Sequence, residues 1–157
     1  MSDLQPIFDL ANFYLKFRLR SRREMRDYLY KKSKTRYFSH ETVDRALDEL
    51  ERLGLINDRE FTRQFISSRN KNRPKSEYIL RRELGKYGIA KEIIDNYFSE
   101  NQPDEEELAF AALQRRWSRL SASDKKNRFQ KAVAFLSRRG FPYDIIKKTI
   151  DKLTEKE

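Results

Sequence analysis

Three stretches of the chain share one pattern of apolar and polar positions. In the clearest copy, Leu84 stands four residues before Gly88. Apolar residues then follow at Ile89, Ile93, Ile94 and Phe98. Spacings of one and four place side chains on one helical face, and glycine fits the left-handed position that ends many helices. The pattern therefore predicts a helix that ends at Gly88, a tight turn, and a second amphipathic helix.

The same pattern occurs twice more. The downstream copy, offset by 52 positions, consists of Leu136, Gly140, Phe141, Ile145, Ile146 and Ile150. The upstream copy, offset by 51 positions, consists of Phe38, Thr42, Val43 and Leu47, with Tyr37 in place of the glycine and a few extra residues near 33–36. One such unit cannot bury its apolar face alone, so three copies predict three stacked helical units.

The fold class follows from this repetition. Only four Gly and four Pro interrupt a chain rich in Lys, Arg, Glu and Leu, and no sustained two-residue alternation indicates a sheet. We therefore expect an all-α protein of three tandem three-helix repeats, each resembling a helix-turn-helix unit. The expected repeats are residues 1–55, 56–102 and 103–157.

Local signals predict where several helices begin and end. Pro6 suits the first turn of a helix that runs to about Arg18. Its buried candidates are Phe8, Leu10, Ala11, Tyr14, Leu15 and Phe17. Ser21 and Glu24 have capping-box spacing. The other expected N-caps are Ser39, Asp58, and a residue between Ser121 and Asp124.

The charge of the chain points to a polyanionic partner. Its 35 Lys and Arg against 25 Asp and Glu give a net charge of +10, which attracts nucleic acid. A soluble protein that is merely basic is the alternative. The absence of Cys excludes disulfides and zinc–thiolate sites and suits a reducing cytosol. No stretch approaches the roughly 18 apolar residues of a membrane span. We expect a cytoplasmic protein without membrane contact.

Enzymatic chemistry finds little support in the sequence. His40 is the only histidine, and no glycine-rich phosphate loop or metal-ligand spacing is present. The acidic run from Asp104 to Glu107 points around a helix rather than converging on a metal, and it suits a helix N-terminus. We therefore expect a protein without catalytic residues, bound metal or cofactor.

Basic residues carry the stronger signal. On the helix expected over Ser76–Tyr87, Leu80 and Leu84 share one side, while arginines and a lysine share the other. A basic segment expected to be a loop precedes Pro74 and Lys75. Together these groups suit phosphates or an acidic protein groove. The candidate binding residues are Arg69, Lys71, Arg73, Lys75, Arg81, Arg82, Lys86, Arg115, Arg116, Arg138, Arg139, Arg22, Arg23 and Arg26. The alternative is that they form ordinary solvated faces.

The ordered set of motifs resembles the RecX family of bacterial regulators of the RecA recombinase. The resembling residues are Gly54–Asp58 with Phe61, Ser68–Arg69, Lys71, Pro74, Ile79, Arg82–Leu84, Gly88–Ile89, Lys131, Phe135–Leu136, Arg138–Phe141 and Ile145. They cover nearly the whole chain, from about Asn12 to Leu153. One departure is Asn70–Arg73, where the family has a glycine-bearing segment before the proline.

The resemblance implies an elongated, curved arrangement of three repeats and binding in the helical groove of the RecA–DNA filament. It also implies inhibition of RecA ATPase, strand exchange and co-protease activity in DNA repair, recombination and the SOS response. We expect a monomer that binds single- or double-stranded DNA weakly and without sequence preference. A stand-alone nucleic-acid-binding module and a helical adaptor that binds only protein stay open as alternatives.

Overall fold

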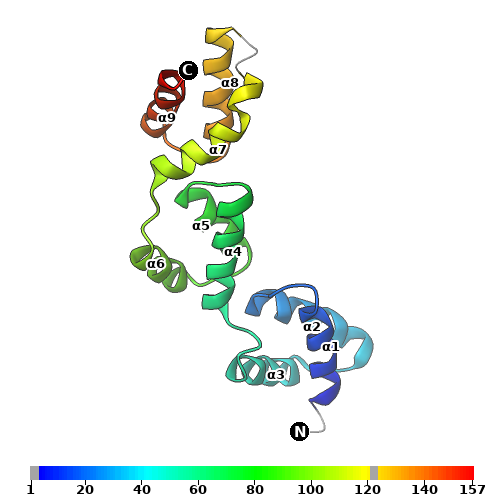
Figure 1. Ribbon diagram of the computed structural model, residues 1–157. Helices are drawn as coiled ribbons and strands as arrows, with labels where there is room; N and C mark the ends of the chain where they lie inside the picture. The colour runs from blue at the N-terminus through cyan, green and yellow to red at the C-terminus, as the bar shows by residue number, and fades with distance from the viewer. Residues whose placement is uncertain (1–3, 121–123) are drawn as a thin grey trace. The chain divides into compact units, whose positions relative to one another are not determined.

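The computed structural model describes residues 4–120 and 124–157, and within them the chain forms nine α-helices and no strand (Figure 1). The helices are α1 (Gln5–Leu15), α2 (Arg22–Arg36), α3 (His40–Arg52), α4 (Asp58–Asn72), α5 (Glu77–Lys86), α6 (Lys91–Glu100), α7 (Glu105–Leu120), α8 (Lys125–Arg138) and α9 (Tyr143–Glu155). The expected all-α fold is confirmed.

The structure divides into two compact units. The first unit comprises the residues up to Gln64 together with Leu84–Tyr97, and the second comprises Phe65–Glu83 with Phe98–Glu157. Each of α4, α5 and α6 therefore contributes to both units. The repeat boundaries expected after residues 55 and 102 stay a prediction.

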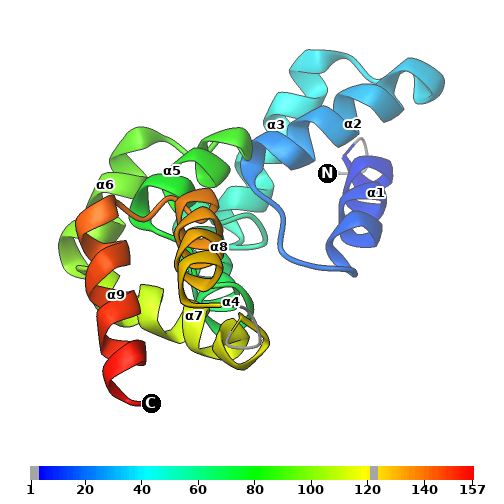
Figure 2. The same cartoon turned by 90° about the horizontal axis from the view of Figure 1, so that it is seen from above.

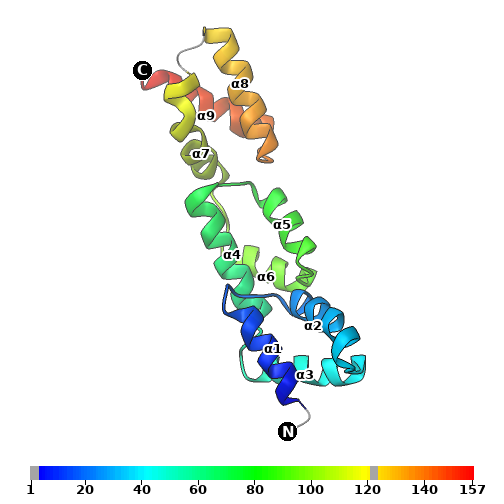
Figure 3. The same ribbon diagram turned by 90° about the vertical axis from the view of Figure 1, so that its right-hand side faces the viewer.

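Each unit contains a three-helix group with its own apolar core. In the first unit α1, α2 and α3 pack on one another (Figure 3). Their core residues are Ile7, Ala11, Met25, Leu29, Val43, Ala46, Leu47, Leu50 and Ile56. In the second unit α7, α8 and α9 pack on one another (Figure 2). Their core residues are Ala109, Ala112, Leu113, Trp117, Ala132, Phe135, Leu136, Phe141, Ile146, Ile150 and Leu153.

The turns confirm the repeat read from the sequence. Gly88 and Gly140 both adopt the left-handed conformation, with φ values of +77° and +87°, and Tyr37 adopts it at the equivalent place with φ of +60°. In the two glycine turns the next residue donates its N–H to the leucine carbonyl, Ile89 to Leu84 and Phe141 to Leu136, at 3.2 Å in both. The two glycine turns are therefore equivalent, and the Tyr37 turn shares their left-handed residue.

The helices that follow these turns repeat one burial pattern. The first position of the pattern is half-buried in every copy, at Thr42, Ile93 and Ile145. The next two positions are buried in every copy. They are Val43 and Leu47, Ile94 and Phe98, and Ile146 and Ile150. Tandem three-helix repeats are thus a property of the fold as well as of the sequence.

Most of the predicted helix starts are confirmed. The Ser21 hydroxyl accepts the N–H of Glu24 while the Glu24 carboxylate accepts the N–H of Ser21, which is a complete capping box. The Ser39 hydroxyl caps α3, and the Asp124 carboxylate accepts the N–H of Asn127 at the start of α8. The other residues of that cap prediction, 121–123, lie outside the described residues.

Three local predictions are wrong. Asn57 rather than Asp58 caps α4, because its side-chain oxygen accepts the N–H groups of Arg59 and Glu60. The first helix ends at Leu15, which leaves Phe17 beyond it and 69% exposed. The segment expected to be a loop before Pro74 is helical up to Asn72, so Arg69 and Lys71 lie on α4.

Within the described residues, none of the helices is long and apolar enough to cross a membrane.

Candidate nucleic-acid interface

The fourteen basic residues predicted as binding candidates fall into both units. Arg22, Arg23, Arg26 and Lys86 belong to the first unit, and the other ten belong to the second. Their environments differ sharply, because some guanidinium groups are bound by nearby acids and others are not. Charge that a neighbouring carboxylate already balances contributes little to binding an external anion.

In the first unit, intramolecular contacts occupy the predicted arginines. The guanidinium of Arg22 binds Asp48 at 2.8 Å and also Glu51. Arg26 forms an ion pair with Asp27 at 3.3 Å. The guanidinium of Arg23 donates to the backbone carbonyl of Lys86. The contacts of Arg22, Arg23 and Arg26 are therefore mainly with other groups of the protein.

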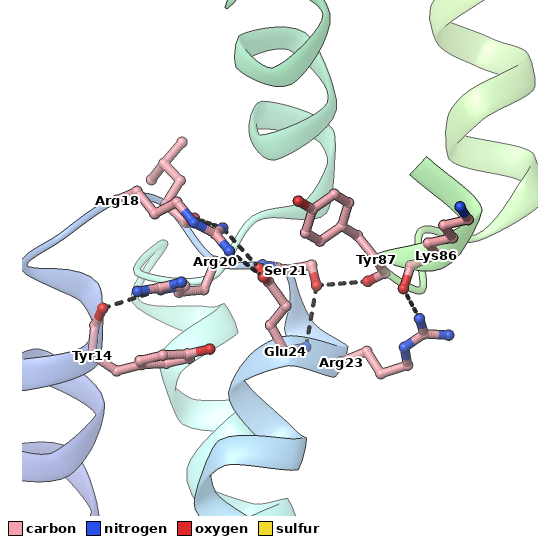
Figure 4. Close-up of polar contacts among 9 residues, drawn as sticks. Tyr14, Arg18, Arg20, Ser21, Arg23, Glu24, Lys86 and Tyr87 are labelled. Carbon is pink, nitrogen blue, oxygen red and sulfur yellow. Dashed lines mark hydrogen bonds and ion pairs between the residues drawn. The ribbon is translucent and has the colours of Figure 1, made fainter. Parts of the chain in front are cut away.

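Arg23 lies where the N-terminal end of α2 contacts the turn after α5 (Figure 4). We call such a contact between a helix start and a glycine turn a joint. The buried Ser21 hydroxyl donates to the carbonyl of Tyr87 at 2.7 Å. A Cβ atom on Gly88 would lie 2.7 Å from the Arg23 side chain. Close approach and a left-handed backbone both require glycine at this position.

Two further candidates share one carboxylate in the second unit. The Nε of Arg69 lies 3.2 Å from an oxygen of Glu83, and the ammonium of Lys75 binds the other oxygen. Burial raises the pKa of Glu83, but the hydrogen bond from Lys75 and the charge of Arg69 outweigh burial and hold the pKa below its usual range. Arg69 and Lys75 are therefore balanced within the protein.

The remaining candidates on α4 and α5 are more exposed. The guanidinium of Arg81 lies 3.7 Å from Glu77 and 4.9 Å from the centre of the Phe98 ring. Lys71, Arg82 and Lys86 are exposed, on the outward side of their helices. The side of α5 that carries Leu80 and Leu84 is buried, as the sequence predicts.

Five arginines of the second unit form what we call the arginine cluster. Its members are Arg73, Arg115, Arg116, Arg138 and Arg139. Two of them are held by backbone carbonyls of the preceding repeat. Arg115 donates to the carbonyls of Lys71 and Asn72 at 2.8 and 2.9 Å, and Arg139 donates to the carbonyl of Pro74 at 3.1 Å. A cation suits the carbonyls that end a helix.

An aromatic ring brings two members together. The guanidinium carbons of Arg116 and Arg139 lie 4.6 and 4.7 Å from the centre of the Phe135 ring. Cations at such distances are attracted to the face of an aromatic ring. Arg73 and Arg138 are exposed. The ring and the carbonyls therefore hold part of the cluster in place while other members face solvent.

The arginine cluster has no acid to balance it. None of its five members forms an ion pair in the part of the chain that the structure describes. Burial lowers the pKa of Arg139, and the charges of Arg116, Arg73, Arg115 and Arg138 lower that pKa further. The four neighbours therefore act on Arg139 as a concentrated positive field, and bringing an anion to this surface would relieve it.

A second joint places Arg138 and Arg139 beside the start of α5. The N–H of Ser76 donates to the carbonyl of Arg139 at 3.1 Å. A Cβ atom on Gly140 would lie 2.3 Å from Ile79 and 2.4 Å from the Ser76 hydroxyl oxygen. The N–H of Glu77 donates to the Glu105 carboxylate at 2.8 Å. Gly140 therefore allows the close contact that places this turn.

The two joints are built alike. In the first, the N–H of Arg22 donates to the Asp58 carboxylate at 2.8 Å, as that of Glu77 does to Glu105 in the second. Asp58 and Glu105 are the first residues of α4 and α7, and burial raises the pKa of both carboxyl groups. A buried serine, Ser21 or Ser76, stands at each helix start.

The residues weighed for catalysis or metal binding have structural roles. The His40 ring stacks on Tyr30 with ring centres 3.9 Å apart. In the acidic run, Asp104 caps α7 by accepting the N–H of Glu107, and Glu106 pairs with Lys148 at 3.1 Å. Trp117 is buried, and its indole N–H donates to Glu157 at 2.9 Å.

Comparison with known proteins identifies the family. Residues 57–97 match the model described as "RecX, second three-helix domain", and residues 104–150 match "RecX, third three-helix domain". A regulatory protein RecX from Chlorobium phaeobacteroides (strain BS1) is 36% identical over 152 residues, which cover 97% of this chain and 96% of that protein. The chain belongs to the RecX family.

Other RecX proteins agree with this assignment. The regulatory protein RecX from Prosthecochloris aestuarii (strain DSM 271 / SK 413) is 34% identical over 152 residues, which are 97% of this chain and 96% of that protein. The crystal structure of RecX from Lactobacillus salivarius is 24% identical, has a TM-score of 0.78, and covers 98% of this chain and 97% of its own. That likeness shows a common fold, and the resemblance read from the sequence is confirmed.

In RecX terms the arginine cluster draws on two domains. Arg73 lies in the region matched to the second three-helix domain, and the other four members lie in the third. The sequence identified all five as basic candidates but did not show that they converge. The pair of repeated turns could have indicated this convergence. A turn that packs against the preceding repeat also brings the arginines beside it close to that repeat.

Proposed function

We propose that this chain binds a filament of RecA on DNA and lowers RecA activity in the control of DNA repair and recombination. The observation that carries the proposal is the arginine cluster, five guanidinium groups without an acidic partner among the described residues. Arginine keeps its charge at physiological pH and fits both phosphates and carboxylates. A filament of protein on nucleic acid offers both kinds of anion.

Membership in a family of regulatory proteins supports a non-catalytic role. A bound regulator changes an enzyme's activity when its affinity differs between two states of that enzyme. We propose that the chain favours a filament state in which ATP hydrolysis, strand exchange and co-protease activity are reduced. Contacts from tandem repeats to neighbouring filament subunits would add through avidity. We place this activity in the cytoplasm, with the chain acting as a monomer.

Reversing exposed members of the arginine cluster tests the proposal. We expect wild-type protein to lower the rate of RecA ATP hydrolysis on single-stranded DNA as it is titrated in. The double variant Arg116→Glu/Arg138→Glu should need at least about tenfold more protein for the same inhibition, because two or more charge contacts are each worth about 1 kcal/mol or more. Circular dichroism checks that helicity is unchanged.

A matched control distinguishes the effect of the arginine cluster from the effect of reversing any two positive charges. The variant Lys126→Glu/Lys147→Glu reverses two exposed cations of the same unit that have no ion-pair partner among the described residues, and it should inhibit like wild type. Equal inhibition by the cluster variant, or no inhibition by wild type, would overturn the proposal. Tight binding of wild type to naked DNA without any effect on RecA would favour a stand-alone nucleic-acid-binding module.

A further inference from the structure

Two tyrosines expose their rings at the starts of α5 and α9, the helices next to the contact between Ser76 and the Arg139–Gly140 turn. Tyr78 is 63% exposed and lies on the first turn of α5, two residues after Ser76, whose N–H binds the carbonyl of Arg139. Tyr143 is 58% exposed and is the first residue of α9, four positions after Arg139. Both residues belong to the second unit.

Three tyrosine rings of the first unit are instead stacked within the fold. Tyr14 stacks on Tyr28 with ring centres 4.1 Å apart, and Tyr30 stacks on His40. The Tyr78 and Tyr143 side chains, in contrast, form no ring contact or hydrogen bond with any described residue. A large exposed aromatic side chain favours binding, because a ligand that covers the ring removes its apolar surface from water.

We propose that Tyr78 and Tyr143 stack against nucleic-acid bases, and that together with the arginine cluster they bind single-stranded nucleic acid in preference to duplex. The inference rests on the proposed function and specifies the ligand of its basic surface. Proteins that bind single strands combine cations along the backbone path with aromatic rings that stack on bases. The second unit supplies both groups.

The preference for single strands follows from whether the faces of the bases are accessible to a tyrosine ring. In a duplex, neighbouring base pairs cover the faces of each base, so a surface tyrosine reaches only phosphate, sugar or groove edge. In a single strand the bases can leave their stack and lie on an aromatic ring. Phosphates contact the arginines in either case. The tyrosines should therefore add affinity for single strands alone, whereas the arginines should add affinity for both.

Tyrosine variants measured on naked DNA test this directly. The probes are a fluorescently labelled oligothymidylate and a duplex of equal length, titrated with full-length protein at one salt concentration. In Tyr78→Ala/Tyr143→Ala, single-strand affinity should fall about fivefold or more for each base that loses its ring, while duplex affinity stays within about twofold. Tyr78→Phe/Tyr143→Phe keeps both rings and should bind like wild type.

Two controls make the result specific. Tyr37→Ala removes a tyrosine that is 94% exposed on the first unit, and it should not change affinity. Arg116→Gln/Arg138→Gln should weaken single-strand and duplex binding alike. For wild type, an oligonucleotide that carries 5-iododeoxyuridine should cross-link on irradiation to peptides containing Tyr78 or Tyr143, which gives an answer even where the alanine variant does not fold.

Several outcomes would overturn the inference. Unchanged single-strand binding by the alanine variant would do so, and so would equal losses on single strand and duplex or cross-links confined to other segments. If no variant binds naked DNA while the arginines still govern RecA inhibition, the surface meets acidic protein. In that case the inference fails and the proposed function stands.

Discussion

At the scale of single residues, Gly88 and Gly140 meet two requirements at once. Both have a positive φ, and both lie against side chains so closely that a Cβ atom would overlap them. Gly54 has a positive φ of +78° with no atom within 4 Å of a built Cβ, and Gly85 has neither restriction. Substitutions at these glycines can therefore distinguish the effect of a left-handed backbone from the effect of a close contact.

Alanine substitution at three of these glycines gives a graded prediction for stability. Gly85→Ala should stabilise by about 0.5–1 kcal/mol, because alanine favours a helix interior. Gly54→Ala should destabilise by about 1–2 kcal/mol through the left-handed backbone alone. Gly140→Ala should destabilise by roughly 3 kcal/mol or more, because overlap adds to strain.

Urea unfolding followed by circular dichroism measures all three variants. The comparison of Gly140→Ala with Gly54→Ala isolates the joint, since both residues share the backbone conformation. Equal destabilisation of the two variants would show that the close approach of Ile79 and Ser76 does not constrain position 140.

At the scale of elements, the joints explain how a turn of one three-helix repeat contacts the preceding repeat within each unit. Each joint pairs an αL glycine turn with the start of the preceding repeat's second helix, and a half-buried carboxylate accepts the first N–H of that helix. Buried polar groups that find partners add specificity to such contacts. Arg115 in turn binds the last carbonyls of α4.

The raised pKa of Glu105 predicts a pH dependence of stability. Because burial raises the pKa of this carboxyl group in the folded protein, the folded state binds its proton more strongly than the unfolded state does. Its contribution is fully present below the ordinary pKa and is lost as pH rises through the higher folded pKa. Glu105→Gln has no such loss and still offers an oxygen to the N–H of Glu77.

The stability of Glu105→Gln relative to wild type should therefore increase with pH, beginning near the ordinary value of 4.5. Urea midpoints at a series of pH values measure this difference. Glu107→Gln removes an exposed carboxylate from the same turn of α7 and reports the general effect of one negative charge. A constant difference between wild type and Glu105→Gln would show that burial does not perturb this group.

Element identity could be predicted from the sequence because its causes are local. Apolar spacing, polar caps such as Ser21, Ser39 and Asp124, and the glycines at positions 54, 88 and 140 set the positions of the turns. The end of α4 could not be predicted, because the arginine that binds its last carbonyls lies 43 and 44 positions away. Asn57 and Asp58 are both good caps by residue type, and Asp58 is instead drawn to the N–H of Arg22.

At the scale of the whole molecule, the net charge of +10 favours a negatively charged partner but does not locate the contact. Arg22, Arg69 and Lys75 are balanced by Asp48, Glu51 and Glu83, which lie 8 to 29 positions away. The arginine cluster is left without such partners. The sequence could therefore name the basic candidates, and only the fold could separate the balanced ones from the rest.

The salt dependence of filament binding tests this account most directly. The affinity of wild type for RecA filaments on single-stranded DNA, measured by co-sedimentation at several salt concentrations, should fall steeply as salt rises. In Arg116→Glu/Arg138→Glu the slope of log affinity against log salt should be smaller by about 2, one for each lost phosphate contact, and in Lys126→Glu/Lys147→Glu it should be unchanged. Equal slopes for wild type and the cluster variant would contradict the claim that the arginine cluster contacts the filament.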